Sequence, residues 1–183
     1  IRPQAGFQLK FLASPADIVI GGGAAGAGKS YALLLENLRH VRNGKFGSVN
    51  FRRTMPQVRN EGGLWDTSTQ IYLGLPNALR PRPLEHSAMW AFPSGARVKF
   101  SHMQYEKDMY SWQGSQVPLI GFDELTHFLS AQFWYMLTRN RSTCGVKPYV
   151  RATTNPQSYG WVKDLIQWWI YPDNYPDEKL RGY

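Results

Sequence analysis

The sequence predicts an α/β domain with a mainly parallel central sheet, helices flanking that sheet, and one antiparallel hairpin. Short apolar segments with strand character alternate along the chain with segments of helical periodicity, which is typical of parallel strands joined by crossover helices. Two segments of alternating polarity, 87–92 and 96–102, flank a Pro-Ser-Gly turn at 93–95, and this pattern indicates a hairpin. The length of 183 residues fits one domain.

The first half of the chain is expected to contain two strands and two helical segments. Helical structure after the first strand is indicated by Ala32, Leu35, Leu38 and Val41, which recur at helical spacing. The expected elements are, in order, a strand at 16–20, a helix at 29–42, a strand at 46–52, a mostly helical segment at 57–74 and a Pro-rich loop at 76–83.

The second half continues the alternation. The run VPLIGF is apolar almost throughout, as expected for a strand that is buried on both faces. On the last expected helix, Trp161, Leu165, Trp168 and Trp169 form a stripe; a packed face is the main interpretation, with base stacking or docking of a neighbouring domain as alternatives. The expected elements are hairpin strands at 87–92 and 96–102, a strand at 117–122, a helix at 130–139, a strand at 147–153 and a helix at 159–170.

The composition favours a polyanionic partner. The 21 Lys and Arg outnumber the 13 Asp and Glu, giving a net charge of +8, which favours nucleic acid over a membrane surface. The single cysteine, Cys144, excludes an internal disulfide. The sequence contains no run of 18 apolar residues, so no membrane span is predicted. Neither Cys144 nor the four histidines show metal-ligand spacing. The chain starts at Ile1 rather than Met and ends after a charged, helix-like stretch, so we expect a piece of a longer protein.

A phosphate-binding loop is predicted directly after the first strand. The segment GAAGAGKS matches G-x-x-x-x-G-K-[ST] in full. Its glycines allow successive backbone N–H groups to point at phosphate oxygens, and the following helix presents its positive amino end to the same anion. We expect Lys29 to reach the β- and γ-phosphates of ATP and Ser30 to bind Mg²⁺. The expected nucleotide-binding residues of this segment are Gly23, Ala24, Ala25, Gly26, Ala27, Gly28, Lys29, Ser30 and Tyr31.

Two adjacent carboxylates, Asp123 and Glu124, follow the predicted strand 117–122. Asp123 can hold the Mg²⁺ shell, and Glu124 can act as the general base on the attacking water. Two acids after a strand can also mark the amino end of a helix, but the upstream phosphate loop favours the catalytic interpretation. The pair therefore predicts a P-loop ATPase of the additional-strand, catalytic-Glu class rather than a GTPase or a small-molecule kinase.

Other polar residues are candidates for contacts with the nucleotide. Thr153, Thr154 and Asn155 lie at the tip of the last predicted strand, where Asn155 is expected to reach the γ-phosphate or its water; a simple turn is the alternative. Gln8 precedes the first strand and can read the adenine edge with one donor and one acceptor. Gln4 is a rival for that role, and a plain surface glutamine is the remaining alternative.

ATP hydrolysis in this class usually needs an arginine near the transferred phosphate, and the phosphate loop contains none. Arg52 and Arg53 directly follow the second strand, and Arg139 and Arg141 follow the helix after the acid pair. These four are the candidates. Most arginines are solvated surface residues, and Arg52 and Arg53 are alternatively expected to contact DNA phosphates.

A set of segments is together more specific than the phosphate loop alone. They are Gln8-x-x-Phe11-Leu12, the phosphate loop, FRRTMPQV at 51–58, SWQGSQ at 111–116, LIGFDELTHF at 119–128, LTRNR at 137–141 and TTNP at 153–156. In order and spacing, over nearly the whole chain, they resemble the ATPase domain of a tailed-bacteriophage large terminase.

The resemblance implies a motor that uses ATP and Mg²⁺ to move double-stranded DNA through a portal protein into an empty procapsid in the host cytoplasm. It implies a small terminase subunit as a further partner, no membrane partner, and a ring of commonly five copies that are monomers in isolation, in which an arginine of one copy completes its neighbour's site. The matching roles are adenine for Gln8, phosphate and metal for Lys29 and Ser30, metal for Asp123, general base for Glu124, and coupling for Thr153–Asn155.

Two departures from the family pattern matter. Many large terminases carry an arginine inside the phosphate loop, whereas residues 24–27 read AAGA, which favours an arginine supplied by a neighbouring subunit. The RNase H-like nuclease of large terminases has no room in 183 residues, so 1–183 is expected to be one ATPase domain without nuclease activity. Alternative functions are a helicase or other nucleic-acid translocase, and a nucleotide-gated binding module with little turnover, against which Glu124 argues.

Overall fold

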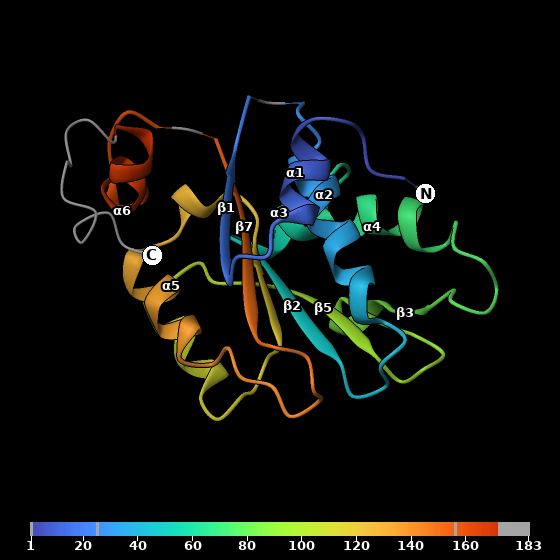
Figure 1. Cartoon of the computed structure of the whole chain (residues 1–183). Coiled ribbons are helices and arrows are strands. Elements are labelled where there is room, and N and C mark those ends of the chain that lie inside the picture. Colours follow the sequence, from blue (N-terminus) through green and yellow to red (C-terminus); the bar gives the residue numbers. More distant parts are fainter. Residues whose placement is uncertain (1, 25, 156, 172–183) are drawn as a thin grey trace.

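A seven-stranded sheet forms the centre of the computed structural model, which describes residues 2–24, 26–155 and 157–171 (Figure 1). The strand order is β1-β7-β6-β2-β5-β4-β3. The strands are β1 (Ile18–Gly22), β2 (Gly47–Arg52), β3 (Arg82–Leu84), β4 (Met89–Ala91), β5 (Arg97–His102), β6 (Leu119–Phe122) and β7 (Tyr149–Thr154).

The topology confirms the predicted fold class. Strands β1, β7, β6, β2 and β5 run parallel, while β4 pairs antiparallel with β5 and with β3. The expected hairpin is the β4–β5 pair, in which Trp90 lies opposite Val98. Strand β7 lies between the phosphate-loop strand β1 and the acid-bearing strand β6, which is the strand insertion that defines the additional-strand class. Because parallel strands end at the same edge, this order brings the tips of β1, β7 and β6 together.

Helices cover both faces of the sheet (Figure 1). Helices α1 to α4 lie on one face, and α5 and α6 lie on the other. The helices are α1 (Phe7–Ala13), α2 (Lys29–Glu36), α3 (Met55–Arg59), α4 (Leu64–Tyr72), α5 (Ser130–Leu137) and α6 (Trp161–Ile170). Four 3₁₀ segments are η1 (Asn37–His40), η2 (Glu85–Ser87), η3 (Glu106–Trp112) and η4 (Leu125–His127).

The core has two main parts, one on each face of the sheet. Alternation along β6 shows the division: Leu119 packs into the cluster beneath α2 and α4, whereas Ile120 and Phe122 pack into the cluster beneath α5 and α6. This strand is buried at every position, as its continuous apolar sequence predicted. The buried strand holds the acid pair that follows it in a fixed position.

Two expected helices differ from the prediction. The segment 29–42 is α-helical only to Glu36 and continues as the 3₁₀ turn η1; the Tyr72 hydroxyl donates to the Leu34 carbonyl (2.9 Å), the acceptor that Leu38 would use in a longer α-helix. The segment 57–74 is two helices, because the chain turns between them at Gly62, where φ is +73°.

Among the described residues, the short elements that were not predicted are α1, β3 and the 3₁₀ segments η2, η3 and η4. Strand β3 begins inside the segment 76–83 that was expected to be a Pro-rich loop, and it contains Pro83, which a strand tolerates at the edge of a sheet. In the part of the chain described, no helix is both long enough and apolar enough to cross a membrane.

Candidate active site

The phosphate loop connects β1 to α2 at the carboxyl edge of the sheet, at the top of Figure 1. Lys29 is the first residue of α2 and is buried. Its Nζ donates to the carbonyl oxygens of Gly23 (2.7 Å) and Ala24 (2.8 Å) and to Oδ1 of Asn155 (2.9 Å). The ammonium group of Lys29 therefore lies against the backbone of the phosphate loop. Ala25, predicted to bind nucleotide, lies outside the described residues.

Gln8 of α1 packs directly against the phosphate loop. Its side chain is buried, and Nε2 donates to the carbonyl of Gly28 at 3.1 Å. The backbone N–H of its rival, Gln4, donates to Oε1 of Gln8 at 2.7 Å. Gln8 is therefore positioned beside the phosphate loop, with its Oε1 held by Gln4; adenine recognition by Gln8 stays a prediction.

Replacing Gly28 with Ala is expected to weaken both the fold and ATP binding. Gly28 has φ +69°, and a Cβ built on it would lie 2.4 Å from Nε2 of Gln8. The left-handed backbone costs a non-glycine residue about 1–2 kcal/mol, and Gln8 must move away from the loop. Urea unfolding and nucleotide binding measure the two effects.

The matched control for this prediction is Gly62→Ala. Gly62 has a similar φ of +73° but no atom within 4 Å of its added Cβ. Both variants should lose stability, Gly28→Ala by more because Gln8 must also move, and only Gly28→Ala should lose ATP affinity. Equal ATP affinities in the two variants would show that the position of Gln8 against the loop does not contribute to ATP binding.

Asp123 lies at the centre of the site. It directly follows β6, is fully buried, and its Oδ1 accepts from the Thr153 hydroxyl of β7 at 2.6 Å. The Ser30 hydroxyl of α2 lies 3.0 Å from each of its carboxylate oxygens. Residues from three segments distant in sequence therefore converge on one carboxylate, as the strand order requires.

Ser30 and Asp123 fit a Mg²⁺ site. Both supply the oxygen ligands that Mg²⁺ prefers, and protein Mg²⁺ sites commonly combine one or two carboxylates with substrate phosphates. Among the residues that the structure describes, no group of three or more His, Cys, Asp or Glu side chains is placed to hold a metal by itself. A cation at Ser30 and Asp123 would take its other ligands from water and nucleotide phosphates.

Glu124 has an unusual backbone and a defined partner. Its φ of +63° and ψ of +60° lie in the left-handed region, which is uncommon for residues other than glycine and clusters at functional sites. Its backbone N–H donates to the Thr153 hydroxyl at 3.3 Å. Its Oε2 accepts from Nδ2 of Asn155 at 2.9 Å, so the Asn155 amide bridges Lys29 and Glu124.

Of the four candidate arginines, Arg52 is the one that the structure brings to the site. Its Nε donates to Oδ2 of Asp123 at 2.6 Å, and its Nη2 lies 2.5 Å from the same oxygen. The neighbouring Arg53 points elsewhere, with Nη1 donating to Oε1 of Gln132 at 3.4 Å. The pairing of Arg52 with Asp123 could not be foreseen, because the two residues are joined only by the side-by-side placement of β2 and β6.

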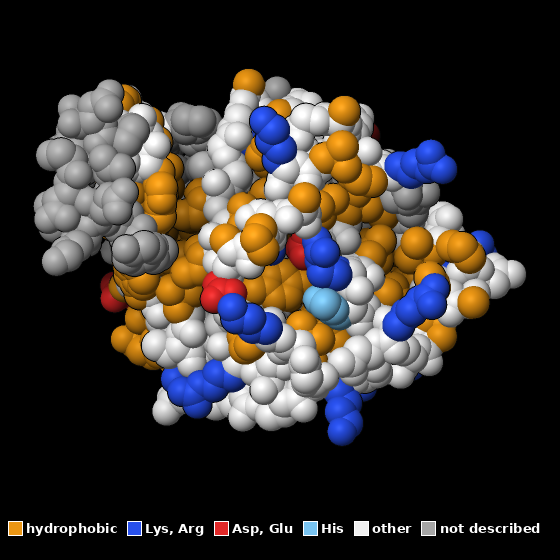
Figure 2. Space-filling view, in the orientation of Figure 1, with side chains coloured by type: hydrophobic (Ala, Val, Ile, Leu, Met, Phe, Trp, Pro, Cys, Tyr) orange, Lys and Arg blue, Asp and Glu red, His pale blue; other side chains and the backbone are white. Residues whose placement is uncertain are grey.

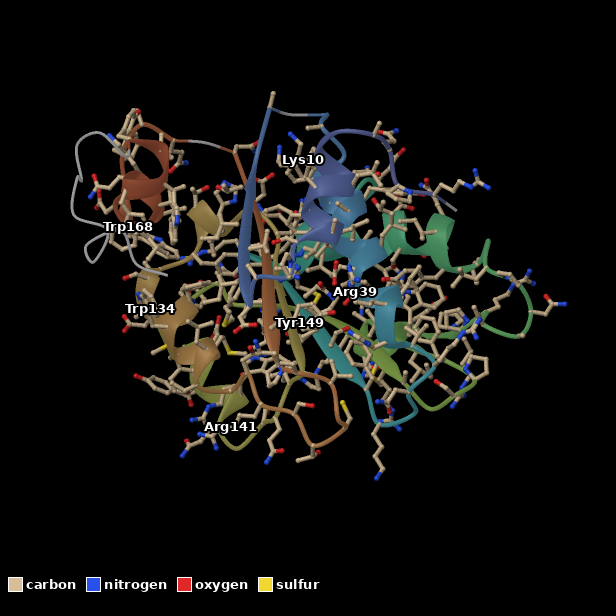
Figure 3. All side chains as sticks on the ribbon, in the orientation of Figure 1. Lys10, Arg39, Trp134, Arg141, Tyr149 and Trp168 are labelled. Carbon is tan, nitrogen blue, oxygen red and sulfur yellow. The ribbon has the colours of Figure 1, made fainter. Side chains whose placement is uncertain are left out.

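Arg139 and Arg141 lie at the opposite edge of the sheet. The carbonyl of Arg139 accepts from the N–H of Val117, just before β6 begins, whereas Asp123 follows the end of that strand. Figure 3 shows Arg141 at the foot of the molecule, remote from the loop between β1 and α2. The structure therefore brings neither arginine to the phosphate loop of its own chain; action of either one in a neighbouring subunit stays a prediction.

The remaining candidates pack against the core. Tyr31 is half-buried and contacts the apolar cluster beneath α2. In the predicted tryptophan stripe, Trp161 packs inward and donates from Nε1 to the Phe128 carbonyl at 2.8 Å. Trp169 is 58% exposed. The stripe is therefore a packed face only in part.

An open pocket of about 400 Å³, lined by both charged and apolar residues, lies at the amino edge of the sheet, away from the phosphate loop. Glu36 is buried, and its Oε1 lies 2.7 Å from Nε of Arg39. Oε2 of the same carboxylate lies 4.0 Å from Nε of Arg151. Burial raises the pKa of Tyr149 and lowers the pKa of Arg151. Charged and histidine side chains gather near the middle of the molecular face that Figure 2 shows, and Figure 3 labels Arg39 and Tyr149 in the same region. Sequence reasoning missed this pocket, although a charged residue, Arg151, inside the predicted strand 147–153 was a signal.

Comparison with solved structures supports the fold. The Thermus phage P74-26 large terminase ATPase domain aligns with a TM-score of 0.63 at 13% identity, over 89% of this chain and 69% of that chain. A large terminase from a thermophilic bacteriophage gives a TM-score of 0.68 at 20% identity, over 94% of this chain but only 44% of its own length. The Phi-28 gp11 DNA packaging motor gives 0.51 at 14% identity, over 88% and 55%.

The family follows from a sequence comparison. A search of curated protein sequences finds no match. The family model described as terminase large subunit, T4-like-virus type, N-terminal, matches residues 20–179, which is most of the chain. The resemblance inferred from the motifs is thereby confirmed, and the chain belongs to the family of T4-like-virus-type terminase large subunits, whose N-terminal part it matches.

Proposed function

We propose that this chain hydrolyses Mg-ATP and that hydrolysis drives double-stranded viral DNA into a procapsid. The observation that carries the proposal is the convergence of Lys29, Ser30, Asp123, Glu124 and Asn155 from three chain segments at one edge of the sheet. Two structures of the thermophilic-phage large terminase, both in the same crystal form, hold ADP and ATP-γ-S, which supports ATP as the ligand of this fold.

Each residue has a task in the proposed reaction. The loop N–H groups and Lys29 bind the phosphates. Mg²⁺ held by Ser30 and Asp123 would neutralise charge on the transferred phosphate. Glu124 accepts the proton of the attacking water as general base. Asn155 donates to Glu124 and accepts from Lys29, so a change at the phosphates alters the position of the general base and of the β7 tip.

DNA contact and assembly extend the proposal beyond the site. The net charge of +8 suits sequence-independent contact with DNA phosphates, and Figure 2 shows Lys and Arg side chains spread around one face. One similar structure is the Phi-28 gp11 DNA packaging motor, and another is the bacteriophage Phi-29 viral genome packaging motor assembly. We propose that this chain likewise acts in a homo-oligomeric ring, commonly a pentamer, with a portal protein and a small terminase subunit in the host cytoplasm.

Phosphate release from ATP tests the function. We expect Mg²⁺-dependent hydrolysis whose rate per molecule rises with protein concentration and with added double-stranded DNA, because a neighbouring copy completes the site. The DNA effect should fall as salt is raised. ATP binding without phosphate release under any of these conditions would instead support a nucleotide-gated binding module, and ATP-dependent separation of duplex strands would support a helicase.

A further inference from the structure

The guanidinium of Arg52 lies in the corner formed by Ser30 and Asp123. Besides its two contacts with Oδ2 of Asp123, Nη2 of Arg52 lies 3.5 Å from the Ser30 hydroxyl. Ser30 and Asp123 are also the two residues whose oxygens fit Mg²⁺. The arginine therefore touches both members of the expected metal-binding pair.

Arg52 compensates the charge of the buried carboxylate. The Asp123 side chain is 0% exposed, whereas that of Arg52 is 21% exposed. In the described part of the chain, Arg52 is the sole cationic side chain that contacts Asp123, because Nζ of Lys29 donates to Gly23, Ala24 and Asn155 instead. A buried carboxylate without a partner is strongly destabilising, so Arg52 contributes to the stability of the site before any metal binds.

An arginine cannot relieve a clash of charges by losing its proton. Its side chain stays charged at any pH that a folded protein tolerates. A divalent cation and a guanidinium that share the same carboxylate repel each other at short range. The partial exposure of Arg52, at the end of β2, leaves room for its side chain to turn.

We propose that Arg52 is a metal-exchanged arginine: it holds Asp123 in the nucleotide-free site and gives up that carboxylate when Mg-ATP binds. On release its guanidinium turns toward the bound phosphates, where it supplies positive charge that the phosphate loop, with no arginine of its own, lacks. This inference rests on the proposed function, because it assumes that Mg-ATP binds at this site.

The proposal predicts how Arg52 affects the Mg²⁺ requirement for nucleotide binding. In the unmodified chain, Mg²⁺ has to displace the guanidinium from Asp123. In Arg52→Ala and Arg52→Gln this competition is absent, so the Mg²⁺ concentration that gives half of the maximal binding should fall on the order of tenfold, equivalent to about 1.4 kcal/mol. Arg52→Lys keeps the charge and should stay near the unmodified value. Turnover should nevertheless fall in the Ala and Gln variants.

The measurement is a Mg²⁺ titration of the binding of a fluorescent, non-hydrolysable ATP analogue. Arg53→Ala is the matched control, because Arg53 is the next residue but contacts Gln132 rather than Asp123; its midpoint should equal that of the unmodified chain. Unfolding curves verify that each variant is folded, and Arg52→Gln serves if the Ala variant is not.

The outcomes separate the inference from the proposed function. A Mg²⁺ midpoint in Arg52→Gln that equals or exceeds that of the unmodified chain would overturn the proposed exchange of Arg52 for Mg²⁺ at Asp123. A fall in the Arg53→Ala midpoint as large as that in Arg52→Gln would overturn it too. If the unmodified chain binds no ATP analogue at any Mg²⁺ concentration, the proposed function itself fails. A tenfold fall confined to the two charge-removing variants would support the exchange.

Discussion

Replacing Glu124 with Gln is expected to abolish ATP turnover and to leave ATP binding intact. The amide has the size of the carboxylate but cannot accept the proton of the attacking water, and general-base catalysis contributes roughly 10²- to 10⁴-fold to a rate. Oε2 of Glu124 accepts from Asn155 at 2.9 Å and does not contact the phosphate loop, so the binding residues keep their positions. Single-turnover phosphate release and equilibrium binding of ATP measure the two quantities separately.

Glu61→Gln is a suitable control, because Glu61 is an exposed carboxylate in the turn between α3 and α4 and should leave both quantities unchanged. The fold should be unaffected in either variant, since Gln at 124 experiences the same left-handed backbone as Glu. Turnover in Glu124→Gln at more than a tenth of the unmodified rate would mean that another group activates the water.

Replacing Lys29 with Met is expected to remove productive binding of the phosphates. The ammonium donates to two loop carbonyls and to Asn155, so its charge is held at the phosphate loop before any nucleotide binds. Losing one such preorganised charged donor costs roughly 10²- to 10³-fold in turnover, and a hydrogen bond to a charged group is worth about 1.5–3 kcal/mol of binding. Calorimetric ATP binding and phosphate release test both losses.

Lys10→Met provides the comparison for Lys29. Lys10 is an exposed lysine on α1, labelled in Figure 3, on the helix that also carries Gln8. Lys10→Met lowers the net charge by the same amount as Lys29→Met but removes no contact with the phosphate loop. Equal ATP affinity in the two variants would show that overall charge, rather than the placement of Lys29, attracts the nucleotide.

The parts of the site that the sequence predicted are those whose chemistry is local. The phosphate loop, Asp123 and Glu124 are each defined by adjacent residues at the end of a predicted strand, and neighbouring strand ends meet at one edge of the sheet. Asn155 was predicted for the same reason, although its bridge between Lys29 and Glu124 depends on β7 lying between β1 and β6. That order is a property of the whole sheet.

The parts that were missed depend on tertiary contacts. Helix α1 has only seven residues, which is too short to be stable alone in water; Phe7 and Phe11 hold it against Gly21, where an added Cβ would lie 2.7 Å from the Phe7 ring. The pairing of Arg52 with Asp123 and the remoteness of Arg139 likewise follow from which strands are neighbours, and the sequence pattern carries no signal for either.

The position of β1 has a consequence for biosynthesis. In the sheet formed by the described residues, β1 is at the edge and pairs with β7 alone. Lys29 and Asn155 are 126 residues apart in sequence, a length that a ribosome takes about 6–25 s to translate at about 5–20 residues per second. During that interval the emerging chain carries its phosphate loop on β1 before the strand that pairs with β1 in the folded domain has been made. A nascent chain halted before Tyr149 would lack the one strand that connects β1 to the rest of the sheet.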